Sequence, residues 1–295
     1  MYYKTYWNKN KTPFLILHWW GGSITSWENV ANMLSKDFFV IVPEIPLAAK
    51  QDNRIKTGLK AGVQKNIKKS SEEKKEFRQI LAQNGDGFKK WIETDFKEAK
   101  LESEKEVYTL DDYAVLIKEF IDKLKLENFI LLGHSNGWAI ATKLVVNFPK
   151  LKVKKLILNN SAWIRKDRKR SLKRKIFWVI AKIVKPIFSL PWMWKLRNLF
   201  YRAIWWQDYL EAEKYPWKKQ TYLNMINEDL QDIFPKINLD TLLIWWENDT
   251  YTPLSDWKKI NNLIKNSKLV IIKNVRHGIH LQKPKKLLEV ILDNN

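Results

Sequence analysis

The sequence contains no cysteine and only four histidines among its 295 residues. The lack of cysteine excludes disulfide bridges, thiolate zinc sites and cysteine nucleophiles, and four histidines leave little material for a histidine metal cluster. We therefore expect no metal and no cofactor. Any chemistry must come from hydroxyl groups, carboxylates or the few imidazoles.

Long apolar runs are also missing. No uninterrupted run reaches the roughly 18 residues of a membrane span, and the first residues, MYYKTYW, lack the apolar core and cleavage site of a signal peptide. The apolar content of 45% is still enough to fill the core of one large domain or two modest ones. The sequence thus predicts a globular, cytoplasmic protein.

The chain carries far more positive than negative charge. Its 53 lysines and arginines against 32 acidic residues give a formal net charge of +21. Such a charge suits nucleic acid or anionic membranes, because lysine and arginine neutralise phosphates. Lysine, asparagine and isoleucine are all abundant, however, which is typical of a genome rich in A and T. We interpret most of the charge as mutational in origin and expect no specific nucleic-acid partner.

Glycine is scarce and tryptophan is abundant. An average glycine usage of about 7% predicts roughly 21 glycines for this length, whereas the sequence has 9 glycines and 16 tryptophans. The glycine deficit and the tryptophan excess are similar in size.

Short apolar segments alternate with amphipathic ones along most of the chain. This alternation predicts a mostly parallel, doubly wound sheet with helices on both faces, an α/β fold. We predict strands at 14–18, 38–42, 129–132, 156–158, 242–245 and 269–272, and helices at 27–34, 110–124, 138–148, 255–264 and 284–292.

Two segments interrupt the alternation. Residues 47–106 are rich in lysine and glutamate with few large apolar residues, which indicates a solvated, partly helical insertion. Residues 163–236 are aromatic-rich and helical in pattern, as expected of a cap inserted between two strands. The core domain then comprises residues 1–162 and 237–295.

The pentapeptide GHSNG, residues 133–137, follows a predicted strand and precedes a predicted helix. In this context Gly-x-Ser-x-Gly is typical of a nucleophile elbow, in which Gly133 and Gly137 leave room for a tight turn that exposes the Ser135 hydroxyl. The alternative is a structural turn between two glycines.

A serine nucleophile needs a base and a group that orients the base. His277 follows the predicted strand 269–272, at the sheet edge where a loop can carry imidazole over the serine. Asp249 follows the predicted strand 242–245 and is the expected acid. Glu247 is its nearest rival, and Asp256 is expected in the first turn of the next helix.

The other histidines have different expected roles. We expect His280 to pack or to cap the chain near its helix, and His18 and His134 to support the loops around the serine by hydrogen bonding. None of the three has the placement of a general base.

These motifs together resemble the α/β-hydrolase-fold serine hydrolases with a helical cap, the branch of esterases and C–C bond hydrolases. HWWGG is similar to the family's HGWGG oxyanion loop, GHSNGW to its GHSxGG elbow, and LLIWWENDTYTP to its LLIWGExDxxTP acid loop. YTLDDYA and HGIHLQKP are similar to its helix before the elbow and its terminal histidine segment. The order Ser135, Asp249, His277 is also the family's order.

The resemblance implies a fold, a site and a reaction. It implies an oxyanion hole made by the backbone N–H groups of Trp20 and Asn136. It implies a hydrolase acting on a small or medium apolar ester, thioester or activated C–C bond, with a small apolar acyl compound as partner. A serine rather than an aspartate at the elbow argues against haloalkane dehalogenase and epoxide hydrolase chemistry.

A different class of function stays open as an alternative. The same fold could serve a non-catalytic binding protein acting at anionic membrane surfaces. Residues 165–190, a basic stretch followed by an apolar one, suit either a weak peripheral membrane contact or the apolar lining of a substrate pocket.

The resemblance also shows where the excess tryptophans lie: several of them occupy positions at which the family favours glycine. Random drift would replace glycine with many residues, mostly small, whereas here one bulky residue recurs. We hypothesise that this sequence is a conceptual translation in which UGA, a glycine codon in the source organism, was read as tryptophan. The alternative is true tryptophan in a loosened or inactive relative. Tryptophans at family glycine positions are Trp19, Trp138 and Trp246, with weaker matches at Trp163 and Trp257; Trp20, Trp27 and Trp245 match family tryptophans.

Overall fold

The fold is described from a computed structural model. The structure describes residues 1–6, 10–18, 22–46, 96–98, 101, 105–159, 215–247, 254–273 and 279–295, with 96–98 described by their backbone alone. Most of the insertion and residues 163–214 of the expected cap lie outside these ranges.

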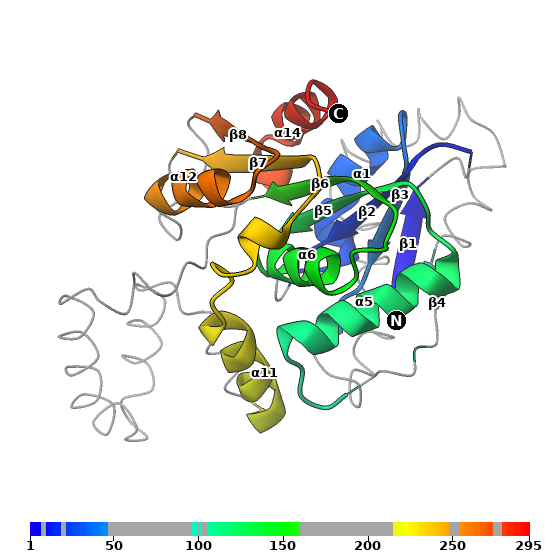
Figure 1. Ribbon diagram of the computed structural model, residues 1–295. Helices are drawn as coiled ribbons and strands as arrows, with labels where there is room; N and C mark the ends of the chain where they lie inside the picture. Colours follow the sequence, from blue (N-terminus) through cyan, green and yellow to red (C-terminus); the bar gives the residue numbers. More distant parts are fainter. Residues whose placement is uncertain are drawn as a thin grey trace, which may run out of the picture.

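An eight-stranded sheet occupies the centre of the described chain (Figure 1). Its order is β4-β1-β3-β2-β5-β6-β7-β8. From β3 to β8 all neighbours are parallel, whereas β1 runs antiparallel to both β3 and β4. This confirms the mostly parallel α/β prediction. The strands are β1 Tyr2–Tyr6, β2 Pro13–Leu17, β3 Phe39–Pro43, β4 Phe96–Glu98, β5 Phe129–His134, β6 Val153–Asn159, β7 Thr241–Trp246 and β8 Ser267–Ile272.

Helices cover both faces of the sheet. Alternate side chains of each strand point to opposite sides, and both sides are apolar, so each needs a covering layer. On β5, Phe129 and Leu131 join one apolar cluster, and Ile130 and Leu132 join the other. The first cluster lies under α5 (Leu110–Leu124), α6 (Asn136–Asn147) and α12 (Leu254–Leu263). The second lies under the 3-10 turn η1 (Ile24–Trp27), α1 (Glu28–Leu34), α13 (Ile279–Gln282) and α14 (Pro284–Leu292).

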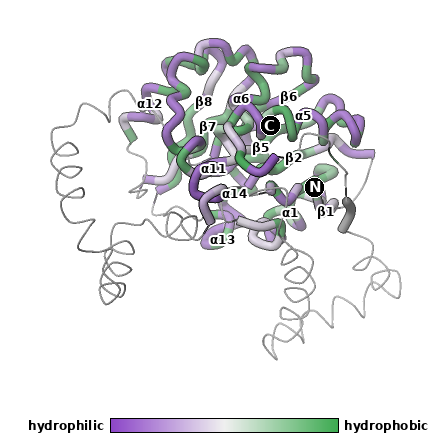
Figure 2. Tube along the Cα trace, turned by 90° about the horizontal axis from the view of Figure 1, so that it is seen from below, coloured by the Kyte–Doolittle hydropathy of each residue, from purple (hydrophilic) through white to green (hydrophobic). Residues whose placement is uncertain are grey.

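The hydropathy of the residues differs between the sheet and the helices that cover it. Figure 2 shows hydrophobic residues on the central strands and stretches of hydrophilic residues on the helices around them. Among the described residues, no helix combines the length and the apolar character needed to cross a membrane.

Two further elements, α11 (Pro216–Asn227) and η3 (Phe234–Lys236), come from the end of the expected cap. Met225, Leu230 and Phe234 are buried in the same apolar cluster as α5, α6 and α12. The end of the segment assigned to the cap is therefore packed into the core.

Helix α5 shows why several element boundaries could be predicted. It begins and ends at the expected residues because Thr109 and Asp112 form a reciprocal capping box at its start. At its end Lys125 takes a left-handed conformation with φ 52 and ψ 44. The face expected to be apolar is buried along its whole length at Leu110, Ala114, Ile117 and Ile121.

Two strands were not predicted. Strand β1 precedes the first expected strand, and β4 lies inside the insertion, residues 47–106, that is expected to be solvated and partly helical. The two pair with each other at the antiparallel edge of the sheet. The described part of the insertion therefore supplies the outermost strand.

Candidate active site

The residues expected to form the site follow strands β2, β5, β7 and β8 at their carboxyl ends. Because these strands are parallel, those ends meet at one edge of the sheet, where α/β folds bind their ligands. Gly133, Ser135, Asn136 and Gly137 are described there. Trp19, Trp20, Asp249 and His277 lie outside the described residues.

Ser135 is the single residue between the end of β5 and the start of α6, and its backbone is strained. Its φ is 53 and its ψ is −119, far from the ψ of 44 that Lys125 takes in the ordinary left-handed region. A conformation of this kind costs a non-glycine residue on the order of 1–3 kcal/mol.

Neighbouring backbone groups hold this turn from both sides. The Ser135 N–H donates to the Asn159 carbonyl at the end of β6, at 3.1 Å. The Ser135 carbonyl accepts from the Trp138 N–H at 3.2 Å, one turn into α6. The strained conformation is therefore fixed by the sheet and by the helix.

The two glycines of the turn have no room for a side chain. A Cβ on Gly133 would lie 2.7 Å from the Gly137 carbonyl oxygen. A Cβ on Gly137 would lie 2.7 Å from the His18 carbonyl oxygen and would also collide with that of Leu17. All of these are backbone atoms, which cannot swing aside. Glycine at 137 therefore lets α6 approach the end of β2 directly.

This packing predicts that Gly137→Ala destabilises the protein by about 3 kcal/mol, the upper end of the usual cost of overpacking. Urea unfolding followed by circular dichroism measures the change. Ala141→Gly in the same helix is the matched control, with an expected cost of about 1 to 2 kcal/mol from helix propensity and the loss of one buried methyl group. Equal losses in the two variants would contradict the predicted clash.

His18, at the end of β2, fastens the start of the expected oxyanion loop. Its buried ring accepts the Ile45 N–H at Nε2, at 3.2 Å. Glu44 lies beside it and accepts the Ile24 N–H at 2.9 Å. His18 is thus tied to the segment after β3, and Glu44 ties that segment in turn to η1. The hydrogen bond at Nε2 is the kind of support expected for His18.

His134 and His280 meet on the opposite side of the sheet from α6. Both are buried, and their ring centroids lie 4.9 Å apart. Trp27 stacks on His280 at 4.7 Å with an interplanar angle of 9°, which confirms a packing role for His280. The start of α13 therefore lies against the residue that precedes Ser135.

The ends of β7 and β8 are joined at the same edge. The Glu247 N–H donates to the Ile272 carbonyl at 3.1 Å. The Glu247 side chain itself is exposed, and Asp256 lies in the first turn of α12 as expected.

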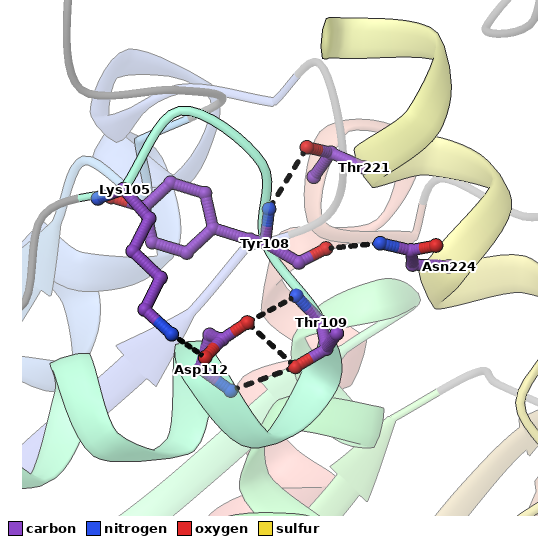
Figure 3. A network of polar contacts seen from close by, with 6 residues as sticks. All are labelled: Lys105, Tyr108, Thr109, Asp112, Thr221 and Asn224. Atoms are coloured by element: carbon purple, nitrogen blue, oxygen red, sulfur yellow. Dashed lines mark hydrogen bonds and ion pairs between the residues drawn. The ribbon is translucent and has the colours of Figure 1, made fainter.

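Helix α11 is hydrogen-bonded to the residue before the start of α5 (Figure 3). No sequence motif predicts these contacts. The Tyr108 N–H donates to Thr221 Oγ1, and Asn224 Nδ2 donates to the Tyr108 carbonyl, both at 3.1 Å. These contacts attach the helix that follows residues 163–214 to the segment that enters α5.

The capping box of α5 completes this network. Asp112 accepts the Thr109 N–H and pairs with Lys105. Burial alone would raise the pKa of Asp112, but the hydrogen bonds from Lys105 and Thr109 hold it below its usual value. Asp112 therefore stays ionised at the start of α5, where a negative charge complements the helix dipole.

Comparisons with known proteins agree with this architecture. Residues 12–175 match the model of a family described as alpha/beta hydrolase fold. Among curated proteins, the chain is 24% identical over 205 residues to the uncharacterized hydrolase YugF of Bacillus subtilis (strain 168), covering 63% of this chain and 72% of that protein. It is 28% identical over 202 residues to the AB hydrolase superfamily protein YisY of the same organism, covering 63% and 73%.

Solved structures give the same picture at lower identity. An esterase from Exiguobacterium antarcticum superposes with a TM-score of 0.61 at 20% identity, covering 99% of this chain and 93% of that one. At this level the similarity concerns the fold.

Proposed function

Because this chain belongs to the α/β-hydrolase fold family and is a hydrolase, we propose that it is a serine hydrolase with Ser135 as nucleophile, His277 as base and Asp249 as acid. Its substrate is a small or medium apolar ester, thioester or activated C–C bond. The observation that carries the proposal is the backbone of Ser135, at φ 53 and ψ −119.

The strain is informative because glycine would remove it. Glycine adopts positive φ without a steric penalty, so a turn that only had to connect β5 to α6 would be more stable with glycine at 135. Serine at this position retains the backbone strain and places a hydroxyl group at the ligand-binding edge of the sheet. Strain of this kind concentrates at functional sites.

Chain connectivity supports the base and the acid. His280 contacts His134, the residue before Ser135. His277 is three residues earlier, and three residues span at most about 11 Å. Asp249 comes two residues after Glu247, whose N–H binds the end of β8. His277 therefore precedes a residue that contacts the elbow, and Asp249 follows a residue held at the same edge of the sheet.

The proposed reaction has two halves. The His277 imidazole takes the Ser135 proton as the hydroxyl oxygen attacks the acyl carbonyl, and returns it to the leaving group. The backbone N–H groups of Asn136 and Trp20 bind the oxyanion. Asn136 is the first residue of α6, so the helix itself does not use its N–H. Water, activated by the same base, then releases the acyl group from Ser135.

A panel of p-nitrophenyl esters with acyl chains of rising length tests the proposal. We expect hydrolysis that depends on chain length, since the cap is expected to line an apolar acyl pocket. Failure to hydrolyse any member, together with binding to anionic phospholipid vesicles, would favour the non-catalytic alternative.

The acid can be tested separately. Asp249→Asn should lower kcat by about 10⁴-fold, the loss measured when the orienting aspartate of a serine protease is replaced in the same way. The reason is that an amide no longer holds the imidazole tautomer or stabilises the imidazolium. Steady-state kinetics on the best ester measures kcat. Glu247→Gln is the matched control and should keep wild-type kcat; the reverse pattern would assign the acid to Glu247.

A further inference from the structure

The side chain of Trp27 packs against the residue that precedes the proposed nucleophile. Its indole is 0% exposed at the end of η1. It stacks on His280 of α13, with ring centroids 4.7 Å apart, and meets His134 of β5 edge-on at 5.5 Å and 68°. His134 is the residue before Ser135. Trp27 therefore joins the end of β5 to α13 by two ring contacts.

The ladder between β2 and β5 stops short of His134. Among the described strands its register ends at Leu17 and Gly133, whereas His134 itself pairs with Asn159 of β6. Strand alternation sends the His134 ring to the same side of the sheet as Leu132, into the apolar cluster under η1. The ring contact from η1 therefore supports the end of β5 where its pairing with β2 has ended.

The turn that carries Trp27 is itself held on both sides of the indole. At the start of η1 the Ile24 N–H donates to the Glu44 carboxylate, in the segment after β3, at 2.9 Å. Directly after Trp27, Glu28 pairs with Lys4 of β1 at 2.7 Å. The indole is therefore mounted on a segment that is tied to two neighbouring parts of the sheet, and it can resist displacement of the ring that it contacts.

The indole acts through its ring rather than through its N–H. Trp27 Nε1 is buried and has no hydrogen-bond acceptor among the described residues. Its stack on His280 has an interplanar angle of 9°, and aromatic contacts stabilise beyond the apolar area that they bury. A smaller aromatic ring would keep such contacts, whereas an aliphatic side chain would lose them. This difference separates support by the rings from simple filling of the core.

We propose that Trp27 is a positioning residue that holds the nucleophile elbow through His134. This rests on the proposed function. The Ser135 backbone is strained at φ 53 and ψ −119, and a strained conformation persists only when its surroundings over-determine it. Hydrogen bonds from β6 and α6 fix Ser135 itself. The stack of Trp27, His134 and His280 fixes the residue before it, and so keeps the Ser135 hydroxyl in its reactive position.

The first test compares Trp27→Leu with Trp27→Phe. Leucine removes both ring contacts, so kcat for the best ester should fall about tenfold, with KM within about twofold of wild type, because small displacements of a reacting group are costly. Trp27→Phe should recover most of that loss. Steady-state kinetics measures both constants.

Phe14→Leu is the matched control. It removes the contact between Phe14 and Phe38, at 5.2 Å, from the same apolar cluster near the start of β2, away from the elbow. This variant should keep wild-type kcat. Equal losses of kcat in Phe14→Leu and Trp27→Leu would mean a general loosening of the core and would overturn the proposal.

The second test measures the strain at Ser135 without any activity. Ser135→Gly relieves the strain and Ser135→Ala retains it, so the glycine variant should melt at the higher temperature. In the Trp27→Leu background this difference should shrink by about half, because residues that act on one turn are coupled. In the Phe14→Leu background it should keep its full size. A difference of the same size in both backgrounds, or none in the wild-type background, would overturn the proposal.

A second variant covers the case in which Trp27→Leu does not fold. His280→Leu removes the other ring of the stack and takes its place in both tests. Wild-type kcat together with an undiminished glycine–alanine difference in His280→Leu would then overturn the proposal.

Failure of this inference can be told from failure of the proposed function. Wild-type protein that neither hydrolyses esters nor reacts with a fluorophosphonate probe would overturn the proposed function. Wild-type protein that does both, with wild-type kcat and an undiminished glycine–alanine difference in Trp27→Leu, would overturn the assignment of Trp27 alone.

Discussion

Ser135→Ala is expected to abolish ester hydrolysis and covalent labelling by a fluorophosphonate probe while the fold persists. The hydroxyl oxygen is the proposed nucleophile, and no acyl-enzyme can form without it. Alanine has the same backbone preferences as serine at φ 53, so the turn is no more strained than before. Activity assays, probe labelling and circular dichroism measure the three quantities. Labelling that survives the substitution would remove Ser135 from the mechanism.

Ser135→Gly separates strain from chemistry. Glycine should be equally inactive but more stable than the alanine variant by about 1 kcal/mol, because it relieves the backbone strain and loses part of that gain through its freer unfolded chain. Thermal unfolding of the two variants measures the difference. A glycine variant less stable than the alanine variant would mean that the turn is not strained, and the main support for a functional Ser135 would be lost.

Most of the sheet could be predicted from the sequence because the parallel strands are continuous apolar runs. The segments 129–134 and 241–246 are buried at every residue, and buried parallel strands show this pattern. Strand β1 has polar or half-buried residues at most positions, and β4 is three residues long in a lysine-rich segment. Both depend on pairing with a partner distant in sequence, which no local pattern records.

The elbow was predictable for a similar reason, since glycine, serine and glycine at fixed spacing describe a single local turn. Asn159 was not predictable. Its sequence context, LILNNS, carries no motif, and its burial follows from lying between two other strands. The contacts of Tyr108 with Thr221 and Asn224 span 113 and 116 residues. Such contacts arise from tertiary packing alone.

Two of the described tryptophans at family glycine positions, Trp138 and Trp246, are packed in ways that bear on the codon hypothesis. Trp138 is 1% exposed and stacks on Phe234 at 5.5 Å, and Trp246 is 0% exposed at the end of β7. Neither indole N–H has a hydrogen-bond acceptor among the described residues. Buried tryptophan usually pairs this donor. The indole N–H of Trp27 also has no acceptor among the described residues, but Trp27 matches a family tryptophan and stacks on His280.

Replacing Trp19, Trp138 and Trp246 together with glycine is expected to raise both the melting temperature and the esterase activity. If glycine is native at these positions, each indole overpacks its site at a cost of about 1 to 3 kcal/mol, and three such sites consume much of a total stability of roughly 5 to 15 kcal/mol. If tryptophan is native, each replacement instead opens a cavity at a cost of about 3 to 5 kcal/mol. The two hypotheses therefore differ in the sign of the change, which thermal unfolding measures.

Trp27→Gly is the matched control for this experiment. Because Trp27 fills the space beside His280 and His134, its removal should lower the melting temperature under either hypothesis. Mass spectrometry of the protein from its own source gives an independent answer. Peptides bearing glycine at 19, 138 and 246 are expected; peptides bearing tryptophan there would overturn the codon hypothesis and make the buried indoles a property of the native core.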